Sequence, residues 1–342
     1  MNTNITTEAG LDRYAIGVDL GSTNVRVGLV RADGIIVASL QELAAGSDPF
    51  DFEPKVEQIA ELVDRLLASW AAMDQRIDGI GLGVGGQINL DGEIVATNGP
   101  QDASWRPFAI RQRVLHHIGR GWTVVVDNDS KSAAWGEYLY GAGRGSQCMV
   151  CVTVGTGIGG GIVVDGRLLQ GAQGLAGHVG FISVDQYGSR CPSGVPGCVE
   201  ELASGTAIAR NARAALCQGC HSLIRDLSQG DPRQVSSKIV FDAARQGDWL
   251  AARVLMDAGH ALGMAICSLL HTLNPDIVVI GGGVAEQGDL FLEPVRRTVA
   301  ENAMTRFRAT PIAAARLGNM AGVAGAAARC WPLSLTVDTG AF

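Results

Sequence analysis

Asp129 lies where a buried strand ends and a helix begins, in the segment VVVDNDSKSAAWGE, residues 124–137. The valines predict a strand and the small and polar residues after them predict a helix, so Asn128 and Asp129 stand at the junction. A carboxylate held there can take the proton from a substrate hydroxyl as a general base. The alternative is that Asp129 only caps a helix beginning near Ser130, although Asn128 beside it supplies a second polar group that a cap does not need.

Two glycine turns follow strands in equivalent places of the two halves of the chain. The first is DLGSTN, residues 19–24, and the second is VGTGIGGG, residues 154–161. Glycines let backbone N–H groups point into one concavity, and hydroxyl side chains add donors, which together suit phosphate oxygens. The residues expected to bind the phosphates are Asp19, Gly21, Ser22, Thr23, Asn24, Gly155, Thr156 and Gly157. Asp19 is also the candidate for orienting Mg²⁺, through water, because hard cations prefer oxygen ligands.

A third glycine turn, IGGGVA at residues 280–285, follows the strand IVVI. Its Gly282 and Gly283 could admit a flat adenosine against the backbone. Each turn by itself is also explained as a hairpin turn in a glycine-rich protein. Gly155, Gly157 and Gly160 match the dinucleotide pattern G-x-G-x-x-G, but a strand and not a helix follows them, which argues against dinucleotide binding.

The elements that position these residues recur in the two halves of the chain. The first half predicts a three-strand meander at 13–39, a helix at 53–73, a strand at 80–84, a helix from about 107 and a strand at 122–126. The second half predicts strands at 148–155 and 159–166, helices at 203–217, 236–246 and 248–272, and a strand in PDIVVIGGG. We therefore expect an α/β protein with a smaller domain at 1–127, a larger domain at 128–319 and a cleft between them. A small-residue helix at about 320–335 is expected to pack back on the first domain.

Composition excludes several classes of protein. With 342 residues, 47% of them apolar, the chain is long and apolar enough for a globular protein of two domains. A net charge of -7 without a cluster of basic residues argues against nucleic acid or an anionic membrane as a partner. The N-terminus has no signal-peptide pattern and the longest apolar stretch, around 261–270, is too short to span a membrane, so a cytoplasmic protein is expected.

Together these motifs resemble the ROK family of bacterial sugar kinases, within the larger group that shares the actin-like ATPase (ribonuclease H-like) fold. The resemblance implies two such domains, ATP and Mg²⁺ as cofactors, transfer of phosphate to a primary hydroxyl of a hexose, and a homodimer. It implies that the first two glycine turns hold the β- and γ-phosphates, that the third lies under adenosine, and that Asp129 is the base. By the same comparison Gly86, Asn98, Asn128 and Glu200 bind the sugar.

The chain departs from the family at a motif that normally binds zinc. The family carries Glu-x-Gly-His followed by Cys-x-Cys-Gly-x-x-Gly-Cys-x-Glu, in which the histidine and three cysteines hold a structural zinc. Here GLAGHVGF places His178 at the glutamate position and Phe181 at the histidine position, and CPSGVPGCVE keeps Cys191 and Cys198 but has Ser193 as its middle residue. A hydroxyl and a phenyl ring cannot complete a closed tetrahedral site, so we predict that structural zinc is absent.

The same departures predict an unusual phosphate acceptor. In the family, the replaced glutamate and histidine contact hydroxyls at the C1 and C2 end of the hexose. Here His178 removes the carboxylate acceptor and adds a possible donor, and Phe181 offers no hydrogen bond. An amino sugar, a deoxy sugar or a carbocyclic cyclitol is therefore favoured over plain glucose. A conventional glucokinase-type enzyme is the alternative. A catalytically inactive sugar sensor or a repressor relative is the alternative of another class, and the first strand near Tyr14 argues against a preceding DNA-binding domain.

Overall fold

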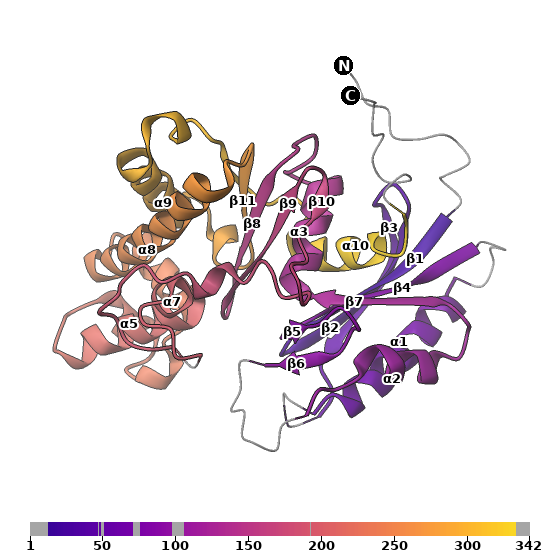
Figure 1. The fold of residues 1–342 in the computed structure, drawn as a ribbon. Coiled ribbons are helices and arrows are strands. Elements are labelled where there is room, and N and C mark those ends of the chain that lie inside the picture. Colours follow the sequence, from indigo (N-terminus) through magenta and orange to yellow (C-terminus); the bar gives the residue numbers. More distant parts are fainter. Residues whose placement is uncertain are drawn as a thin grey trace.

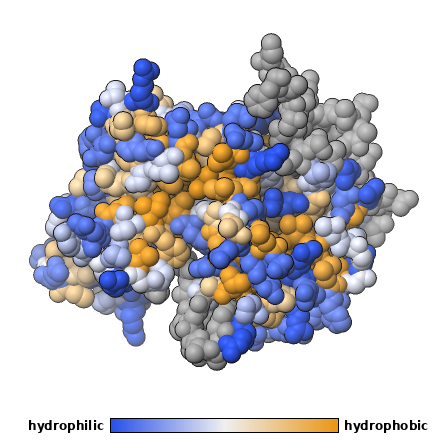
Figure 2. All heavy atoms as spheres, viewed as in Figure 1, coloured by the Kyte–Doolittle hydropathy of each residue, from blue (hydrophilic) through white to orange (hydrophobic). Residues whose placement is uncertain are grey.

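The computed structural model describes residues 13–46, 48, 51–70, 76–97, 106–191 and 193–332. It contains two five-stranded sheets that lie side by side, with two helices between them, α3 (Asp129–Tyr140) and α10 (Ala321–Ala328) (Figure 1). Figure 2 shows the surface hollowed between the part that holds α5 and α7 and the part that holds β5 and β6. Ligand sites commonly lie in such a hollow between two α/β units.

The first sheet has the strand order β3-β2-β1-β4-β7. Its strands are β1 (Arg13–Leu20), β2 (Asn24–Arg31), β3 (Ile36–Leu43), β4 (Arg76–Val84) and β7 (Thr123–Asn128). The first three form the predicted antiparallel meander, whereas β4 and β7 run parallel to β1. Because the carboxyl ends of parallel strands meet at one edge, this sheet brings Asp19, Gly85 and Asn128 to the same side.

Helices α1 (Glu53–Ala68) and α2 (Ile110–Ile118) pack on this sheet, and a short hairpin joins β5 (Gln87–Ile88) to β6 (Ile94–Ala96). The buried apolar face of α1 consists of Val56, Ile59, Leu62, Val63 and Leu66. Burying each such side chain stabilises the fold by about 1.5–3 kcal/mol. Helix α2 begins at Ile110 and not near 107, because the backbone of Phe108 pairs with Ile94.

The second sheet has the order β10-β9-β8-β11-β12. Its strands are β8 (Met149–Val154), β9 (Ile158–Val164), β10 (Arg167–Leu168), β11 (Ile277–Gly281) and β12 (Ile312–Ala314). Its helices are α4 (Val199–Ala203), α5 (Gly205–Cys217), α6 (Leu223–Leu227), α7 (Ser237–Arg245), α8 (Trp249–Leu273) and α9 (Asp289–Asn302). The turn at 154–161 joins the antiparallel strands β8 and β9, so its glycines open no helix, as expected.

Within the described part of the chain, α8 is the one helix long and apolar enough to cross a membrane by length and composition. It is longer than the apolar stretch at 261–270 because it continues back to Trp249. Of its most apolar window, 67% is buried inside the protein, where it packs against α9, α4 and α7. Its apolar residues are therefore explained by the core of the second half.

Small residues let α3 and α10 approach each other closely. A Cβ atom on Gly325 would lie 1.7 Å from the carbonyl oxygen of Ser132, and one on Gly136 would lie 2.5 Å from that of Ala321. Helix α10 also packs against β1 and β4, so the C-terminal helix does return to the first sheet. The division into domains at 127 and 128 stays a prediction.

Glu137 lies further along α3, where a charged side chain usually faces solvent. Its carboxylate is buried, with 1% exposure, and accepts hydrogen bonds from the backbone N–H groups of Ala142 (2.8 Å), Arg316 (2.9 Å) and Leu317 (2.7 Å). A buried carboxylate is tolerated when several donors satisfy it. Glu137 therefore attaches α3 to the segment that precedes α10.

Candidate active site

Asp129 is the first residue of α3, and Asn128 is its N-cap. The side-chain oxygen of Asn128 accepts hydrogen bonds from the backbone N–H groups of Ser130 (3.0 Å) and Lys131 (3.2 Å). The interpretation in which Asp129 caps a helix beginning at Ser130 is therefore wrong, because the cap lies one residue earlier. This arrangement fixes the start of the helix without using the Asp129 side chain as the cap.

The Asp129 carboxylate is half-buried at the edge of the first sheet. Its Oδ1 accepts from the backbone N–H of Ser130 at 2.7 Å, and its Oδ2 lies near Gly85, where a Cβ atom would be 3.7 Å away. Burial raises the pKa of Asp129 above its usual range, although the hydrogen bonds from Ser130 lower it. A raised pKa makes the carboxylate a better proton acceptor, which a general base requires.

The turn that follows β4 is fixed to the start of α3. The side-chain amide of Asn128 donates to the carbonyl oxygen of Gly86 at 2.9 Å. Gly86 has a φ of 124°, in the region that favours glycine, and a Cβ atom there would lie 2.9 Å from the carbonyl oxygen of Ala96. The structure thus brings together two of the predicted sugar-binding residues, while Asn98 lies outside the described residues.

Asp19 is the next-to-last residue of β1 and lies close enough to Asp129 to interact with it electrostatically. Burial, and then the negative charge of Asp129, raise the pKa of Asp19 to about 6, although Arg26 lowers it. The Arg26 guanidinium forms an ion pair with Asp19 at 2.9 Å, which the sequence did not predict. A Cβ atom on Gly322, at the start of α10, would lie 3.1 Å from Asp19 Oδ1, so only glycine leaves room there for the carboxylate.

The rest of the first glycine turn presents donors to solvent. The N–H of Gly21 donates to the carbonyl oxygen of Asn24 at 3.0 Å and closes the turn between β1 and β2. Ser22 and Thr23 at its tip are exposed. Exposed hydroxyls and a closed glycine turn are compatible with the predicted binding of phosphate oxygens.

Two hydroxyls connect the second glycine turn to the start of α3, where Asp129 lies. Thr153, on β8 just before the turn, donates from its Oγ1 to the Oγ of Ser130 at 2.8 Å, next to Asp129. On the other side of the turn, Glu200 accepts the N–H of Ile158 at 2.7 Å, and burial raises the pKa of Glu200. The structure therefore places Glu200, predicted to bind the sugar, against the turn at 155–157.

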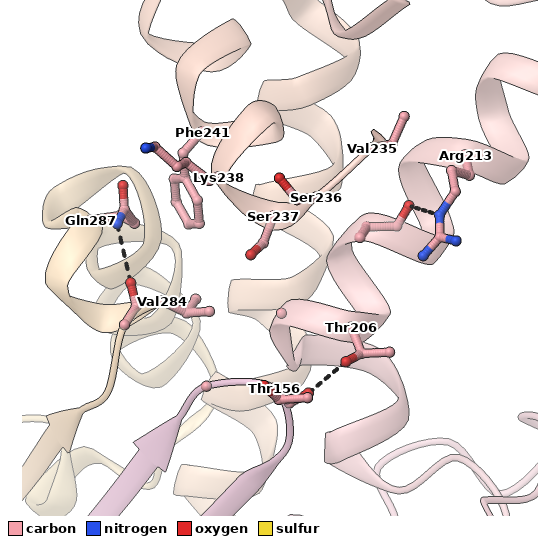
Figure 3. Close-up of a pocket in the computed structure, with 14 residues that line it drawn as sticks. Thr156, Thr206, Arg213, Val235, Ser236, Ser237, Lys238, Phe241, Val284 and Gln287 are labelled. Atoms are coloured by element: carbon pink, nitrogen blue, oxygen red, sulfur yellow. Dashed lines mark hydrogen bonds between the residues drawn. The ribbon is translucent and has the colours of Figure 1, made fainter. Parts of the chain in front are cut away.

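A pocket of about 570 Å³ lies between the second and third glycine turns (Figure 3). It contains the predicted residues Gly155, Thr156 and Gly283, and it contains none of the first turn. Val284 donates its N–H to the Val154 carbonyl at 3.0 Å, and a Cβ atom on Gly282 would lie 2.5 Å from that oxygen. The third turn is thus held against the end of β8, and the predicted residue Gly282 is not among those that line the pocket.

Most of the residues that line this pocket were not predicted from the sequence. The unpredicted lining residues with polar or aromatic side chains are Thr206, Arg213, Ser236, Ser237, Lys238, Phe241 and Gln287. Figure 3 shows Lys238 and Phe241 of α7 across from Val284 and Gln287. Ser236 caps α7, so its residue type predicts a helix start and gives no sign of a ligand. Only the fold brings α7 opposite the turn after β11.

His178 precedes a short 3₁₀ turn, Val179–Phe181, and Phe181 ends it; the two ring centroids lie 6.1 Å apart. His178 is half-buried. Burial, and then the positive charge of Lys131, lower the pKa of His178, whereas the charge of Asp129 raises it. The imidazole is therefore neutral at pH 7 and lies within electrostatic reach of Asp129.

The two retained cysteines of the family's zinc motif are buried, with exposures of 4% for Cys191 and 0% for Cys198. The Cys191 thiol lies 2.8 Å from the hydroxyl of Ser193. Among the described residues no group of three or more metal-ligating side chains occurs. Two sulfur ligands with a hydroxyl and a phenyl ring do not fit a closed zinc site, so the absence of zinc stays a prediction.

The sequence matches the profile of the ROK family over residues 15–330. This chain belongs to the ROK family. The ROK protein is 34% identical over 313 residues to the glucokinase of Thermotoga maritima, an alignment that covers 91% of this chain and 95% of that protein. It is 35% identical over 318 residues to the glucokinase of Halalkalibacterium halodurans, an alignment that covers 92% of this chain and 94% of that protein.

A solved structure agrees with this membership. The ROK family glucokinase of Streptomyces griseus, in complex with glucose and AMPPNP, superposes with a TM-score of 0.76 at 30% identity, covering 92% of this ROK protein and 98% of that chain. The predicted α/β fold of the actin-like ATPase type, with mixed sheets flanked by helices, is therefore confirmed.

Proposed function

We propose that this ROK protein transfers the γ-phosphoryl group of ATP to a primary hydroxyl of a hexose or sugar-like ring, with Asp129 as the general base. The observation that supports this most is the position of Asp129, between the Gly86 turn and the strand that leads into the second glycine turn. A base beside a phosphate-binding turn suits transfer between a hydroxyl and a nucleotide. The relatives named glucokinase, at 34% and 35% identity, support the same reaction class.

In the proposed reaction Asp129 takes the proton of the sugar hydroxyl as that oxygen bonds to the γ-phosphorus. The bond from phosphorus to the leaving oxygen of ADP breaks in the same step, so the products are a sugar phosphate, ADP and a protonated Asp129. The raised pKa of Asp129 favours the protonated state that the step produces. Asn128 fixes the helix start and the Gly86 turn, and so orients the base against the sugar.

On the nucleotide side, the turn at 155–157 would receive the phosphates and the pocket beside Gly283 the adenosine. A pocket of about 570 Å³ is in the range of ligand sites for molecules of this size. Asp19 fits the role of orienting Mg²⁺, because its carboxylate is raised in pKa to about 6 by burial and by Asp129, and a cation relieves that repulsion. Bound Mg²⁺ supplies neutralisation of the phosphate charge.

For the acceptor we propose an amino sugar, a deoxy sugar or a carbocyclic cyclitol in preference to glucose. His178 is neutral and lies within electrostatic reach of Asp129, with Phe181 beside it, so this end of the site offers an imidazole and a phenyl ring. A site with an imidazole in place of a carboxylate favours an acceptor ring with a different substituent at that end. Glucose is the second candidate, because the relatives at 34% and 35% identity are named glucokinases. We further propose a homodimer that acts in the cytoplasm.

Purified protein tests this proposal when it is assayed with ATP and Mg²⁺ against hexoses, amino sugars, deoxy sugars and cyclitols. ADP release and the mass of the product are measured for each acceptor. We expect phosphate on a primary hydroxyl, with the highest kcat/KM for an amino sugar, a deoxy sugar or a cyclitol. Glucose as the best acceptor would support the conventional enzyme, and binding of a sugar without any turnover would support the inactive sensor.

A further inference from the structure

A buried lysine lies two residues after the proposed base. Lys131 on α3 forms an ion pair with Asp127 of β7 at 2.9 Å, and the two side chains are only 2% and 6% exposed. Burying a lysine is costly unless its charge and its three N–H donors are satisfied. The proposed reaction does not use the charge of Lys131, so the buried ion pair of Lys131 and Asp127 must have another role.

The other two donors of Lys131 reach a segment far away in the sequence. The ammonium group donates to the side-chain oxygen of Gln170 and to the carbonyl oxygen of Gly174 at 2.8 Å. Gln170 in turn donates from its amide to Asp127 at 2.9 Å. Asp127, Lys131 and Gln170 therefore form a closed polar ring in which every donor of the lysine has a partner.

The segment that this ring holds is the loop at 169–178, between β10 and the 3₁₀ turn, and it ends in His178. At Gly174 the loop passes against the backbone of residues 88–90, since a Cβ atom there would lie 3.0 Å from the carbonyl oxygen of Ile88 and from the N–H of Leu90. The loop thus contacts the first half of the chain while Lys131 holds it from α3. Asp129 and Lys131 stand on the same first turn of that helix.

We propose that Lys131 is a positioning residue that holds the loop at 169–178, and with it His178, in a fixed place beside Asp129. Lys131 affects the affinity for the phosphate acceptor and the order of the loop, and its side chain does not touch the reacting atoms. The kinetic part of this inference rests on the proposed function. The structural part, the order of the loop, does not.

The double variant Asp127→Asn/Lys131→Met tests the proposal, because it removes the lysine without leaving a buried aspartate charge in its place. It also removes the longer ion pair of Asp127 with Arg329, at 3.6 Å. Lys55→Met is the matched control: Lys55 is also buried, at 2% exposure, but donates to the carbonyl oxygens of Asp48 and Asp51 beside α1. Amide hydrogen exchange across the chain is measured without any sugar, and KM for the acceptor and for ATP are measured where a substrate is known.

We expect amides of the loop at 169–178 to exchange at least about tenfold faster in the double variant, with the rest of the chain near wild type. KM for the acceptor should rise about tenfold while KM for ATP stays within about twofold. Unchanged loop exchange in a folded double variant, or equally faster exchange everywhere, would overturn the proposal. If wild-type protein phosphorylates no sugar, the proposed function fails, while the exchange experiment still decides the role of Lys131.

Discussion

The side-chain amide of Asn128 donates to the carbonyl oxygen of Gly86 at 2.9 Å, across the edge of the first sheet. The oxygen of the same amide accepts the N–H groups of Ser130 and Lys131, which uses both of its lone pairs. One N–H of Asn128 is then available for a substrate hydroxyl. Asn128 therefore combines a cap, a connection between two turns and one remaining donor beside Asp129.

Replacing Asn128 by alanine should cost stability and acceptor affinity together. Loss of the cap is expected to lower the free energy of unfolding by about 0.5–2 kcal/mol. Urea unfolding measures the loss of stability, and KM for the acceptor measures the loss of acceptor affinity. Asn128→Ser is the matched variant: serine is a good cap but has no amide, so stability should stay closer to wild type while KM still rises. An alanine variant as stable as wild type would show that the cap is not needed.

Exchange of His178 for glutamate together with Phe181 for histidine should move preference toward ordinary hexoses. These two changes restore the residues that the ROK motif has at both positions, and with them a carboxylate acceptor for a hydroxyl. We expect the ratio of kcat/KM for glucose to that for the preferred acceptor to rise about tenfold or more. An unchanged ratio in a folded, active double variant would mean that these positions do not set specificity.

The neutral state of His178 predicts a dependence of stability on pH. Because folding lowers the pKa of His178 below 6.5, the unfolded chain binds more protons in the window just below 6.5, and stability falls as the pH drops through it. In His178→Gln this contribution is absent. The stability of wild type relative to this variant should therefore decrease between about pH 7 and pH 5 in urea unfolding.

His221→Gln is the control for this experiment, since His221 is exposed. Its stability relative to wild type should change less over the same pH range than that of His178→Gln. Parallel curves for wild type and His178→Gln would contradict the buried, neutral imidazole.

Purified protein should contain well under one equivalent of zinc. Cys191 and Cys198 remain, but Ser193 and Phe181 replace the other two ligands of the family's site. The double variant Phe181→His/Ser193→Cys restores the full ligand set and should raise the zinc content toward one equivalent by elemental analysis. A stoichiometric amount of zinc in the wild-type protein would contradict the loss of the site.

Local sequence predicted the parts of this site that depend on neighbouring residues. The strand, turn and helix around Asp129 and the glycine turns at 19–24 and 154–161 lie as expected, because hydrophobic pattern and glycine spacing determine them locally. Contacts between distant segments escaped the same analysis. Glu137 looked solvated by its residue type, and it is buried because Arg316 and Leu317, some 180 positions away, supply its donors.

The pocket between the second and third glycine turns and the polar ring around Lys131 were missed for the same reason. Lys238 and Phe241 face the third glycine turn only because the fold places α7 opposite the turn after β11, and no residue spacing within α7 indicates a ligand site. From its position in a helix, Lys131 would be taken for an ordinary surface lysine. It is buried because the loop that carries Gln170 covers it. Helix α9 was also missed, since Pro294 lies inside it and proline normally predicts a helix end.

The most direct test of the central claim is the phosphorylation rate of Asp129→Asn with the best acceptor of wild-type protein. We expect kcat to fall about 10²- to 10⁴-fold, because asparagine cannot take the proton. KM for ATP should stay within about twofold. Asp165→Asn, at an exposed position in the hairpin after β9, is the matched control and should keep wild-type activity. An Asp129→Asn protein that retains most of the wild-type kcat would contradict the assignment of Asp129 as the base.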